Sequence, residues 1–172
     1  NTSTIPISLL VEKMPESFQR RFAITHYFNP VRYMRLLELV RGTATDADVM
    51  QKLADFNDRE LSKGVVSCND TPGFLGNRVG VFALQVGIDE AVSLNLPIER
   101  ADALMGRPMG IPKTGVFGLY DLIGIDLMCD VVRSLRSILP EGDAFHAVGA
   151  ENAMINAMVD AGLTGQKGGG GF

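Results

Sequence analysis

The chain is poor in cysteine, in positive charge and in long uninterrupted apolar runs. Its 172 residues include only two cysteines, Cys68 and Cys129, and these have neither metal-ligand spacing nor the pattern of a disulfide framework. We therefore expect reduced, buried thiols in a cytoplasmic protein. Sixteen basic against 20 acidic residues give a net charge of −4, which offers no electrostatic reason to expect nucleic acid or an anionic membrane as a partner.

Membrane insertion and export are also not indicated. No basic segment followed by an apolar run opens the sequence, so no signal peptide is evident. Residues 74–96 are nearly long enough to cross a bilayer, but polar and charged side chains interrupt them. We expect a buried helix here instead. The interrupting residues are Asn77, Arg78, Gln85, Asp89 and Glu90.

The most informative feature that is present is a histidine and a glutamate twelve residues apart, His26 and Glu38. Residues 22–28 and 33–40 are rich in β-branched, aromatic and aliphatic types on either side of Pro30, which predicts two strands around a turn. With the turn centred near residue 32, His26 falls opposite Glu38, within reach of a carboxylate that fixes the imidazole tautomer. The alternative is an ordinary strand histidine and a solvated glutamate.

The stretches around this pair belong to a longer pattern. In order along the chain, they are His26-Tyr-Phe-Asn-Pro30, Met34-Arg-Leu-Leu-Glu38, Asp70-Thr-Pro-Gly-Phe-Leu-Gly-Asn-Arg78 and Gly106-Arg-Pro-Met-Gly-Ile-Pro-Lys113, flanked by Asn1-Thr-Ser-Thr4 and Lys167-Gly-Gly-Gly-Gly-Phe172. Together they closely resemble the 3-hydroxyacyl-CoA dehydrogenases of fatty-acid β-oxidation. Because several separated motifs occur in the right order, the resemblance is far more specific than any one motif, and it runs almost end to end.

The resemblance implies an NAD-dependent enzyme that oxidises a 3-hydroxyacyl-CoA to the 3-ketoacyl-CoA. In such an enzyme His26 accepts the hydroxyl proton and Glu38 stabilises the imidazolium. Four further residues match positions that contact the ligands: Ser3 and Asn77 at the substrate oxygen, Asn29 near the nicotinamide, and Lys167 near the cofactor.

Two of these roles have a plain structural alternative. Asn77 could be an asparagine that satisfies a helix end, and Lys167 could lie in a mobile, solvated tail. The rival function for the whole chain is a non-catalytic helical module for dimerisation or acyl-CoA binding that keeps the motifs only as packing. Against this, packing alone does not require the polar set of His26, Glu38 and Asn77.

One element of such an enzyme is missing from the sequence. No Gly-x-Gly-x-x-Gly turn occurs, although hydride chemistry with a dinucleotide needs a cradle for the pyrophosphate. The glycine run at 168–171 cannot replace it, because no helix follows. The resemblance places residue 1 late in the NAD-binding domain, so we expect a fragment that is inactive by itself. Arg32-Tyr-Met34 and Gly110–Gly115 look closest to bacterial members that are joined to enoyl-CoA hydratase in one chain.

The remaining patterns predict the remnant of a Rossmann-type α/β domain over residues 1–70. A helix over 7–17, broken near Pro15, precedes the two strands. A helix over 46–61 and a strand over 65–68 follow them. The apolar face of the helix over 46–61 is expected at Val49, Leu53 and Phe56.

Residues 71–172 are expected to form an all-α domain that self-associates as a homodimer, so that the whole chain is mostly α. The central helix, 74–94, shows two apolar stripes and should be packed all round. Further helices are predicted over 97–105, 116–139 and 150–161, with a loop over 107–115. The two stripes of the central helix are Val79, Phe82 and Val86, and Val81, Leu84 and Ile88.

Overall fold

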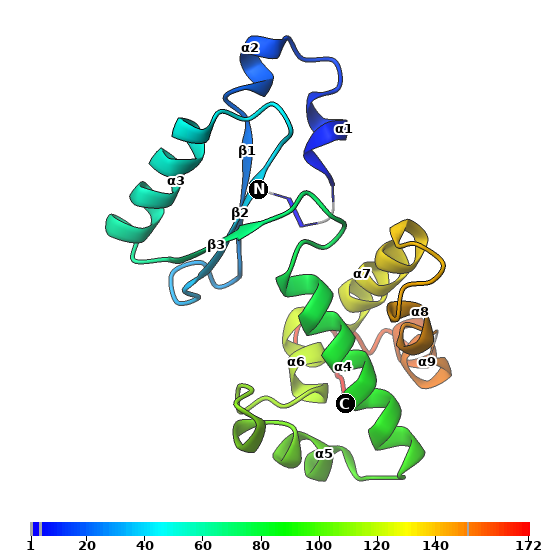
Figure 1. The fold of residues 1–172 in the computed structure, drawn as a ribbon. Helices are drawn as coiled ribbons and strands as arrows, with labels where there is room; N and C mark the ends of the chain where they lie inside the picture. The colour runs from blue at the N-terminus through cyan, green and yellow to red at the C-terminus, as the bar shows by residue number, and fades with distance from the viewer. Residues whose placement is uncertain (1, 4, 151) are drawn as a thin grey trace. The chain divides into compact units, whose positions relative to one another are not determined.

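The chain folds into two compact units, residues 1–78 and residues 79–172. A computed structural model describes residues 2–3, 5–150 and 152–172. The class is the expected one: an α/β portion with a three-stranded sheet is followed by a helical portion (Figure 1). The expected domain boundary at residue 70 remains a prediction.

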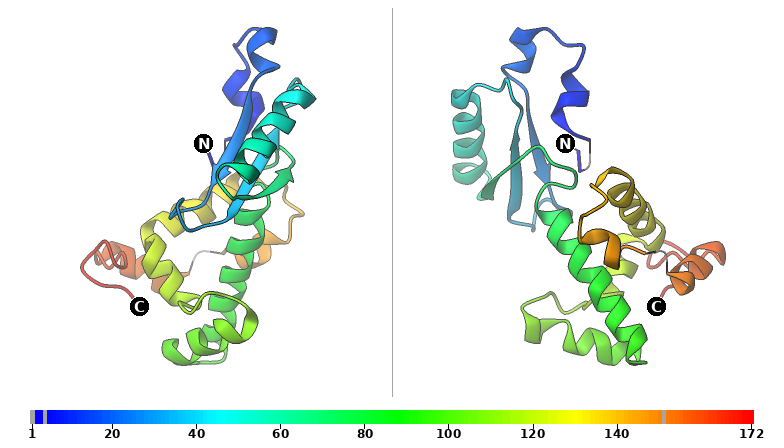
Figure 2. Two further views of the ribbon diagram at one scale, coloured as in Figure 1. Left: turned by 90° about the vertical axis from the view of Figure 1, so that its left-hand side faces the viewer. Right: turned by 45° about the vertical axis from the view of Figure 1, so that its right-hand side comes forward.

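The first unit contains three short strands and three helices. Its helices lie on both sides of the sheet: α3 runs along one face and α1 along the other, and Figure 2 shows the same arrangement from two further sides. In chain order the elements are α1 (Ile7–Val11), α2 (Glu16–Gln19), β1 (Ala23–Tyr27), β2 (Leu36–Arg41), α3 (Ala47–Arg59) and β3 (Gly64–Cys68).

The sheet has the order β1-β2-β3, with β2 antiparallel to β1 and parallel to β3. The predicted register is confirmed, because His26 pairs with Glu38. Since side chains alternate between the two faces of a strand, this pair shares one face with Ile24 and Val40. That face packs against α1 in a small apolar core, whose buried members are Ile7, Val11, Ile24, Val40 and Phe74.

The other face of the sheet meets α3, and here one expectation was wrong. Phe56 does not face the sheet but is 53% exposed. Asn57 takes the inward position instead, because it follows Val49 and Leu53 at intervals of four residues. Its buried amide accepts a hydrogen bond from the Tyr27 hydroxyl at 2.5 Å, which satisfies a polar group that would otherwise be costly to bury.

The second unit is helical. Its elements are α4 (Gly76–Ser93), whose first turn belongs to the first unit, then α5 (Ile98–Leu104), the 3₁₀ turn η1 (Arg107–Met109), α6 (Phe117–Ile123), α7 (Ile125–Ile138), α8 (Phe145–Val148) and α9 (Ala153–Asp160). Among the described residues no helix combines the length and apolar character needed to cross a membrane.

Helix α4 is not packed all round, as its two apolar stripes suggested. The stripe of Val81, Leu84 and Ile88 is buried in the core of the second unit. The other stripe is only partly covered: Phe82 packs against that core, whereas Val79 is 61% exposed. Periodicity therefore identified an apolar surface but could not show how much of it this chain covers.

The single helix expected over 116–139 is two helices, α6 and α7, separated at Gly124. This glycine adopts φ 111°, a conformation that interrupts a helix. The C-terminal segment uses the break, since the Ile125 amide donates to the Thr164 carbonyl oxygen at 3.2 Å. The Lys167 side chain lies where a Cβ on residue 124 would be. A segment forty residues further along the chain thus lies directly against the break between α6 and α7.

Candidate active site

The site begins with a short contact between the paired strand residues His26 and Glu38. The imidazole Nδ1 lies 2.6 Å from the carboxylate Oε2, and both side chains are buried. Because β1 and β2 are paired in this register, the backbone itself sets the two groups opposite each other. A buried carboxylate in this position orients the ring and stabilises its protonated form.

The second carboxylate oxygen of Glu38 is held by the turn that leads into α4. The backbone amides of Leu75 and Gly76 donate to Oε1 at 2.8 and 2.6 Å, and the Cys68 thiol lies 3.7 Å from the same oxygen. Burial raises the pKa of Glu38, but the hydrogen bonds from His26, Gly76 and Leu75 outweigh it, so the pKa lies below its ordinary value. Glu38 is therefore ionised at neutral pH.

An ionised carboxylate can only accept hydrogen bonds, which fixes the tautomer of His26. Nδ1 must carry the hydrogen that it donates to Glu38. In the neutral ring Nε2 is then left with a lone pair, which can accept a hydrogen bond from the Ser3 hydroxyl at 2.9 Å. The ring thus presents a proton-accepting nitrogen to a hydroxyl group, which is the arrangement that a general base requires.

Two aromatic rings confine the imidazole. The centroid of Phe28 lies 4.6 Å from that of His26, and the centroid of Phe74 lies 5.7 Å from it, both in tilted orientations. A Cβ on Gly76 would lie 2.5 Å from the Phe28 ring, so the start of α4 approaches this ring closely. These rings exclude water from the base and restrict its rotation.

The structure thus brings three of the six predicted site residues together: Ser3, His26 and Glu38. Asn77 directly follows Gly76 in the first turn of α4, and within the described part of the chain its side-chain amide has no hydrogen-bond partner in the protein. The role of Asn77 at the substrate oxygen stays a prediction. Asn29 is exposed in the loop after β1, in a cis peptide with Pro30.

Lys167 lies in the second unit, within a folded turn rather than a solvated tail. Its ammonium pairs with the Asp126 carboxylate at 2.8 Å and lowers the pKa of that group. The turn is closed by a bridge between Gly165 and Gly170, and Phe172 packs its ring against Phe117.

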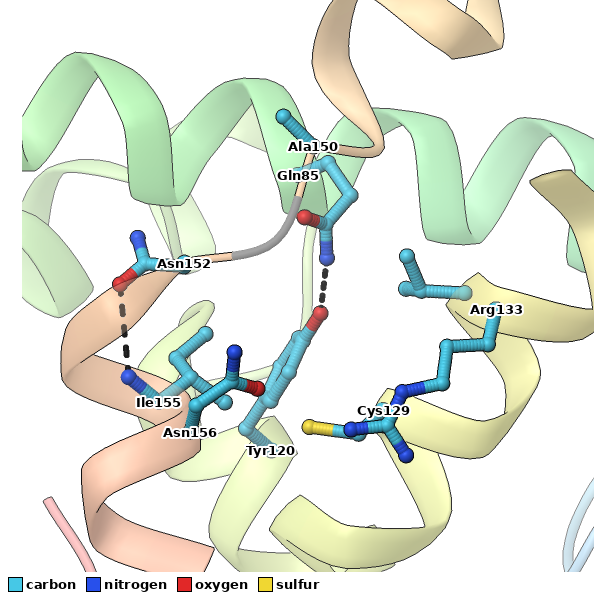
Figure 3. A pocket seen from close by; sticks show the side chains of 9 residues that line it. Gln85, Tyr120, Cys129, Arg133, Ala150, Asn152, Ile155 and Asn156 are labelled. Atoms are coloured by element: carbon cyan, nitrogen blue, oxygen red, sulfur yellow. Dashed lines mark hydrogen bonds between the residues drawn. The ribbon is translucent and has the colours of Figure 1, made fainter.

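The second unit also contains a small, partly open pocket with a mainly apolar lining (Figure 3). Gln85 and Tyr120, both buried, form a hydrogen bond at its edge, with the amide as donor. The pocket has a volume of about 30 Å³, enough for ordered water but far too small for a coenzyme. Its lining residues are Gln85, Tyr120, Cys129, Val132, Arg133, Ala150, Asn152, Ile155 and Asn156.

Several contacts at the site could not be named from the sequence. The amides of Leu75 and Gly76 are backbone groups, so their side chains gave no indication of the bonds to Glu38. The ring contacts of Phe28 and Phe74 depend on tertiary structure. One signal was available: Asp70-Thr-Pro-Gly73 marks a turn, and turns before helices often direct backbone amides at an anion.

Comparison with known proteins assigns both parts of the chain. Residues 1–71 match the sequence model of the 3-hydroxyacyl-CoA dehydrogenase NAD binding domain, and residues 73–172 match that of the C-terminal domain. The chain belongs to the 3-hydroxyacyl-CoA dehydrogenase family. Its first part accordingly belongs to that family's NAD-binding domain.

Two relatives and one solved structure illustrate the similarity. A protein of Rickettsia felis named as a trifunctional enzyme of the fatty acid oxidation complex is 43% identical over the whole chain, which spans 24% of that protein. A protein of Deinococcus radiodurans named as a 3-hydroxyacyl-CoA dehydrogenase is 35% identical over the whole chain, which spans 49% of that protein. The structure of (S)-3-hydroxybutyryl-CoA dehydrogenase from Ralstonia eutropha matches with a TM-score of 0.77 and 27% identity, covering 97% of this chain and 56% of that one.

Proposed function

We propose that this chain is part of an NAD-dependent 3-hydroxyacyl-CoA dehydrogenase that oxidises 3-hydroxyacyl-CoA to 3-ketoacyl-CoA in fatty-acid β-oxidation. The observation that carries the proposal is the buried hydrogen-bonded series from Glu38 through His26 to Ser3. Packing alone gives no reason to bury an ionised carboxylate against an imidazole whose other nitrogen faces a hydroxyl. Family membership supplies the substrate class.

In the proposed reaction His26 is the general base. Nε2 takes the proton from the substrate's 3-hydroxyl while the C–H bond at the same carbon breaks, and Glu38 stabilises the imidazolium that results. The Ser3 hydroxyl, already within 2.9 Å of Nε2, holds the reacting oxygen beside the base. Asn77 binds the same oxygen, because an amide can donate a hydrogen bond to it both before and after oxidation.

The residues present suit NAD in part. Bound NAD supplies the hydride acceptor. Asn29 offers an exposed amide on the loop that directly follows the strand of His26, a suitable donor and acceptor for a carboxamide. Lys167 offers a half-exposed cation for the cofactor. The Gly-x-Gly-x-x-Gly turn that cradles a pyrophosphate is not in this sequence, so that contact must come from residues outside it.

We also propose three features of the whole protein. The Rickettsia felis relative, of which this chain spans about a quarter and which is named as a trifunctional enzyme, supports a larger chain with further activities. Enoyl-CoA hydratase is the further activity that the family resemblance implies. Exposed apolar side chains in the helical unit, such as Val92, Leu94 and Leu122, support a homodimer formed through that unit. Two cysteines without a disulfide agree with a cytoplasmic location. Light scattering over a range of concentrations tests the dimer, and a monomer throughout would contradict it.

The function is tested by replacing His26 in the protein that carries this chain together with a complete dinucleotide-binding domain. His26→Ala removes the base and should lower kcat by about 10² to 10⁴, with little change in NADH affinity. Glu38→Gln should also lower kcat, because it keeps the shape but loses the charge. The matched control is His146→Ala, since the only other histidine bonds the Pro140 carbonyl oxygen in the helical unit. An unchanged kcat in His26→Ala, with both ligands bound, would refute the role of His26 as the base. No turnover in the unsubstituted protein would favour the non-catalytic helical module.

A further inference from the structure

Phe74 has an unusual backbone conformation for its residue type. Its φ is 47°, in the left-handed region, and it directly follows Gly73 at φ 74°. The other described non-glycine residues with positive φ are Ser62 and Asn95, which are small and polar. A bulky aromatic residue in this region is an outlier, and such strain persists only where the surroundings enforce it.

The strained backbone determines where the next two amides point. The turn begins with a hydrogen bond from the Phe74 amide to the Thr71 carbonyl oxygen at 2.9 Å. It then reverses direction, so that the amides of Leu75 and Gly76 both reach Oε1 of Glu38. Amides at the start of a helix have no partner within the helix, and here the carboxylate serves two of them. The backbone conformation of Phe74 therefore positions the two amides that hold Glu38.

The side chain of Phe74 reaches the other member of the pair. Its ring is buried in the apolar core beneath the sheet and lies in tilted contact with the His26 ring. Packing of the ring into this core provides the free energy that offsets the backbone strain. One residue thus acts on both groups, on Glu38 through the backbone and on His26 through the side chain.

We propose that Phe74 is a positioning residue for the His26–Glu38 pair, and this rests on the function proposed above. Its left-handed backbone directs the two amides at Glu38, and its ring limits the rotation of His26. The two contributions can be separated by substitution. Glycine adopts positive φ freely, so Phe74→Gly loses the ring but relieves the backbone strain. Phe74→Ala keeps the strain of a residue with a Cβ and loses the ring packing that offsets it.

The direct test is NMR of the imidazole protons in the 172-residue chain. With only two histidines, a His146→Gln variant assigns the signals without ambiguity. The Nδ1 hydrogen of His26 should give a low-field signal that exchanges slowly with water. Exchange should become at least about tenfold faster in Phe74→Ala, since opening of the local hydrogen bonds sets this rate. Phe74→Gly should exchange at a rate between those of Phe74→Ala and the unsubstituted chain.

The matched control is Phe22→Ala, which removes a ring from the same apolar core but has no ring contact with His26. It should leave the His26 signal unchanged. Phe74→Leu keeps more of the apolar volume and replaces Phe74→Ala where the alanine variant does not fold. An unchanged His26 signal in the Ala or Leu variant would overturn the proposal, as would an equal effect of Phe22→Ala.

Kinetics in the protein with a complete dinucleotide-binding domain separates this proposal from the function itself. Phe74→Ala should lower kcat by about 10- to 100-fold, the usual effect of a small misplacement of a catalytic group, and should change KM for NAD by less than twofold. Phe74→Gly should retain more of kcat. If the unsubstituted protein shows no dehydrogenase activity, the proposed function fails whatever Phe74 does. If His26→Ala is inactive but the Phe74 variants match the unsubstituted enzyme, only the positioning role fails.

Discussion

The ammonium of Lys63 donates a hydrogen bond to the carbonyl oxygen of Met34 at 2.9 Å, although the lysine lies just before β3 and the methionine in the loop between β1 and β2. It also bonds the carbonyl oxygen of Val31 in the same loop. Lys63 is only 6% exposed. A buried cation thus holds together the loop that carries Asn29.

Replacing this lysine should loosen the loop. In Lys63→Met two carbonyl oxygens lose their charged donor, which should lower the free energy of unfolding by about 1 to 3 kcal/mol, as for other hydrogen bonds to charged groups. Urea unfolding measures the change. Lys52→Met is the control, because Lys52 is exposed on α3 and pairs only with Asp48, and it should change stability by less than about 0.5 kcal/mol. Equal effects of the two substitutions would contradict this role of Lys63.

Acid should destabilise the first unit through Glu38. The pKa of this carboxyl is below its ordinary value of 4.5 in the folded chain, so its stabilising contribution is present above pH 4.5 and is lost as the pH falls through the folded value. Glu38→Gln has no such titration. The difference in unfolding free energy between the two chains should therefore shrink as the pH is lowered below 4.5. A difference that stays constant with pH would show that folding does not lower the pKa of Glu38.

The buried pair in the helical unit should matter for stability alone. In Tyr120→Phe the Gln85 amide loses its acceptor and stays buried, which should cost about 1 to 3 kcal/mol of unfolding free energy. Tyr33→Phe removes the same hydroxyl from an exposed ring and should be nearly neutral. Thermal and urea unfolding compare the two. Equal stability of both variants would mean that water replaces the tyrosine as partner of Gln85.

The thiol of Cys68 should react slowly. Burial raises its pKa, and the charge of Glu38 and the hydrogen bond to it raise it further, so little thiolate exists at neutral pH. In a Cys129→Ala background, iodoacetamide should modify Cys68 more slowly than it modifies glutathione at the same pH. Adding Glu38→Gln should speed the reaction, because the neighbouring charge is gone. Labelling as fast as that of glutathione would contradict the raised pKa.

The sequence alone predicted those structural features that depend on residues close together in the chain. The register of His26 with Glu38 followed from alternation along two strands and from one turn, both readable over nineteen residues, 22–40. The helix over residues 76–93 followed from apolar periodicity. The family resemblance assigned Ser3 to the substrate oxygen, but its contact with His26 was not predicted, because 23 residues separate the two and no pattern joins them. The functional roles of Ser3, Asn29, Asn77 and Lys167 stay predictions.

The errors arose where distant residues decide a local structure. Gly124 stands at the break between α6 and α7, where Lys167 leaves no room for a Cβ on residue 124. Periodicity over residues 116–139 cannot predict that contact. Phe56 was assigned to the inward face of α3, but Asn57 occupies that position. Asn57 can be buried there because the Tyr27 hydroxyl on β1 donates a hydrogen bond to it. The donors to Glu38 are backbone N–H groups, which every residue except proline carries. No sequence motif can therefore identify them.

The two carboxylate oxygens of Glu38 have different partners. The length of the side chain at residue 38 therefore matters as well as its charge. Oε2 must reach the ring of His26 while Oε1 reaches the backbone before α4, and both distances are 2.6 to 2.8 Å. Aspartate carries the same charge but is shorter by one methylene group, about 1.5 Å along the bond. It could meet one partner only by withdrawing from the other. The span between strand and helix therefore selects glutamate over the shorter acid.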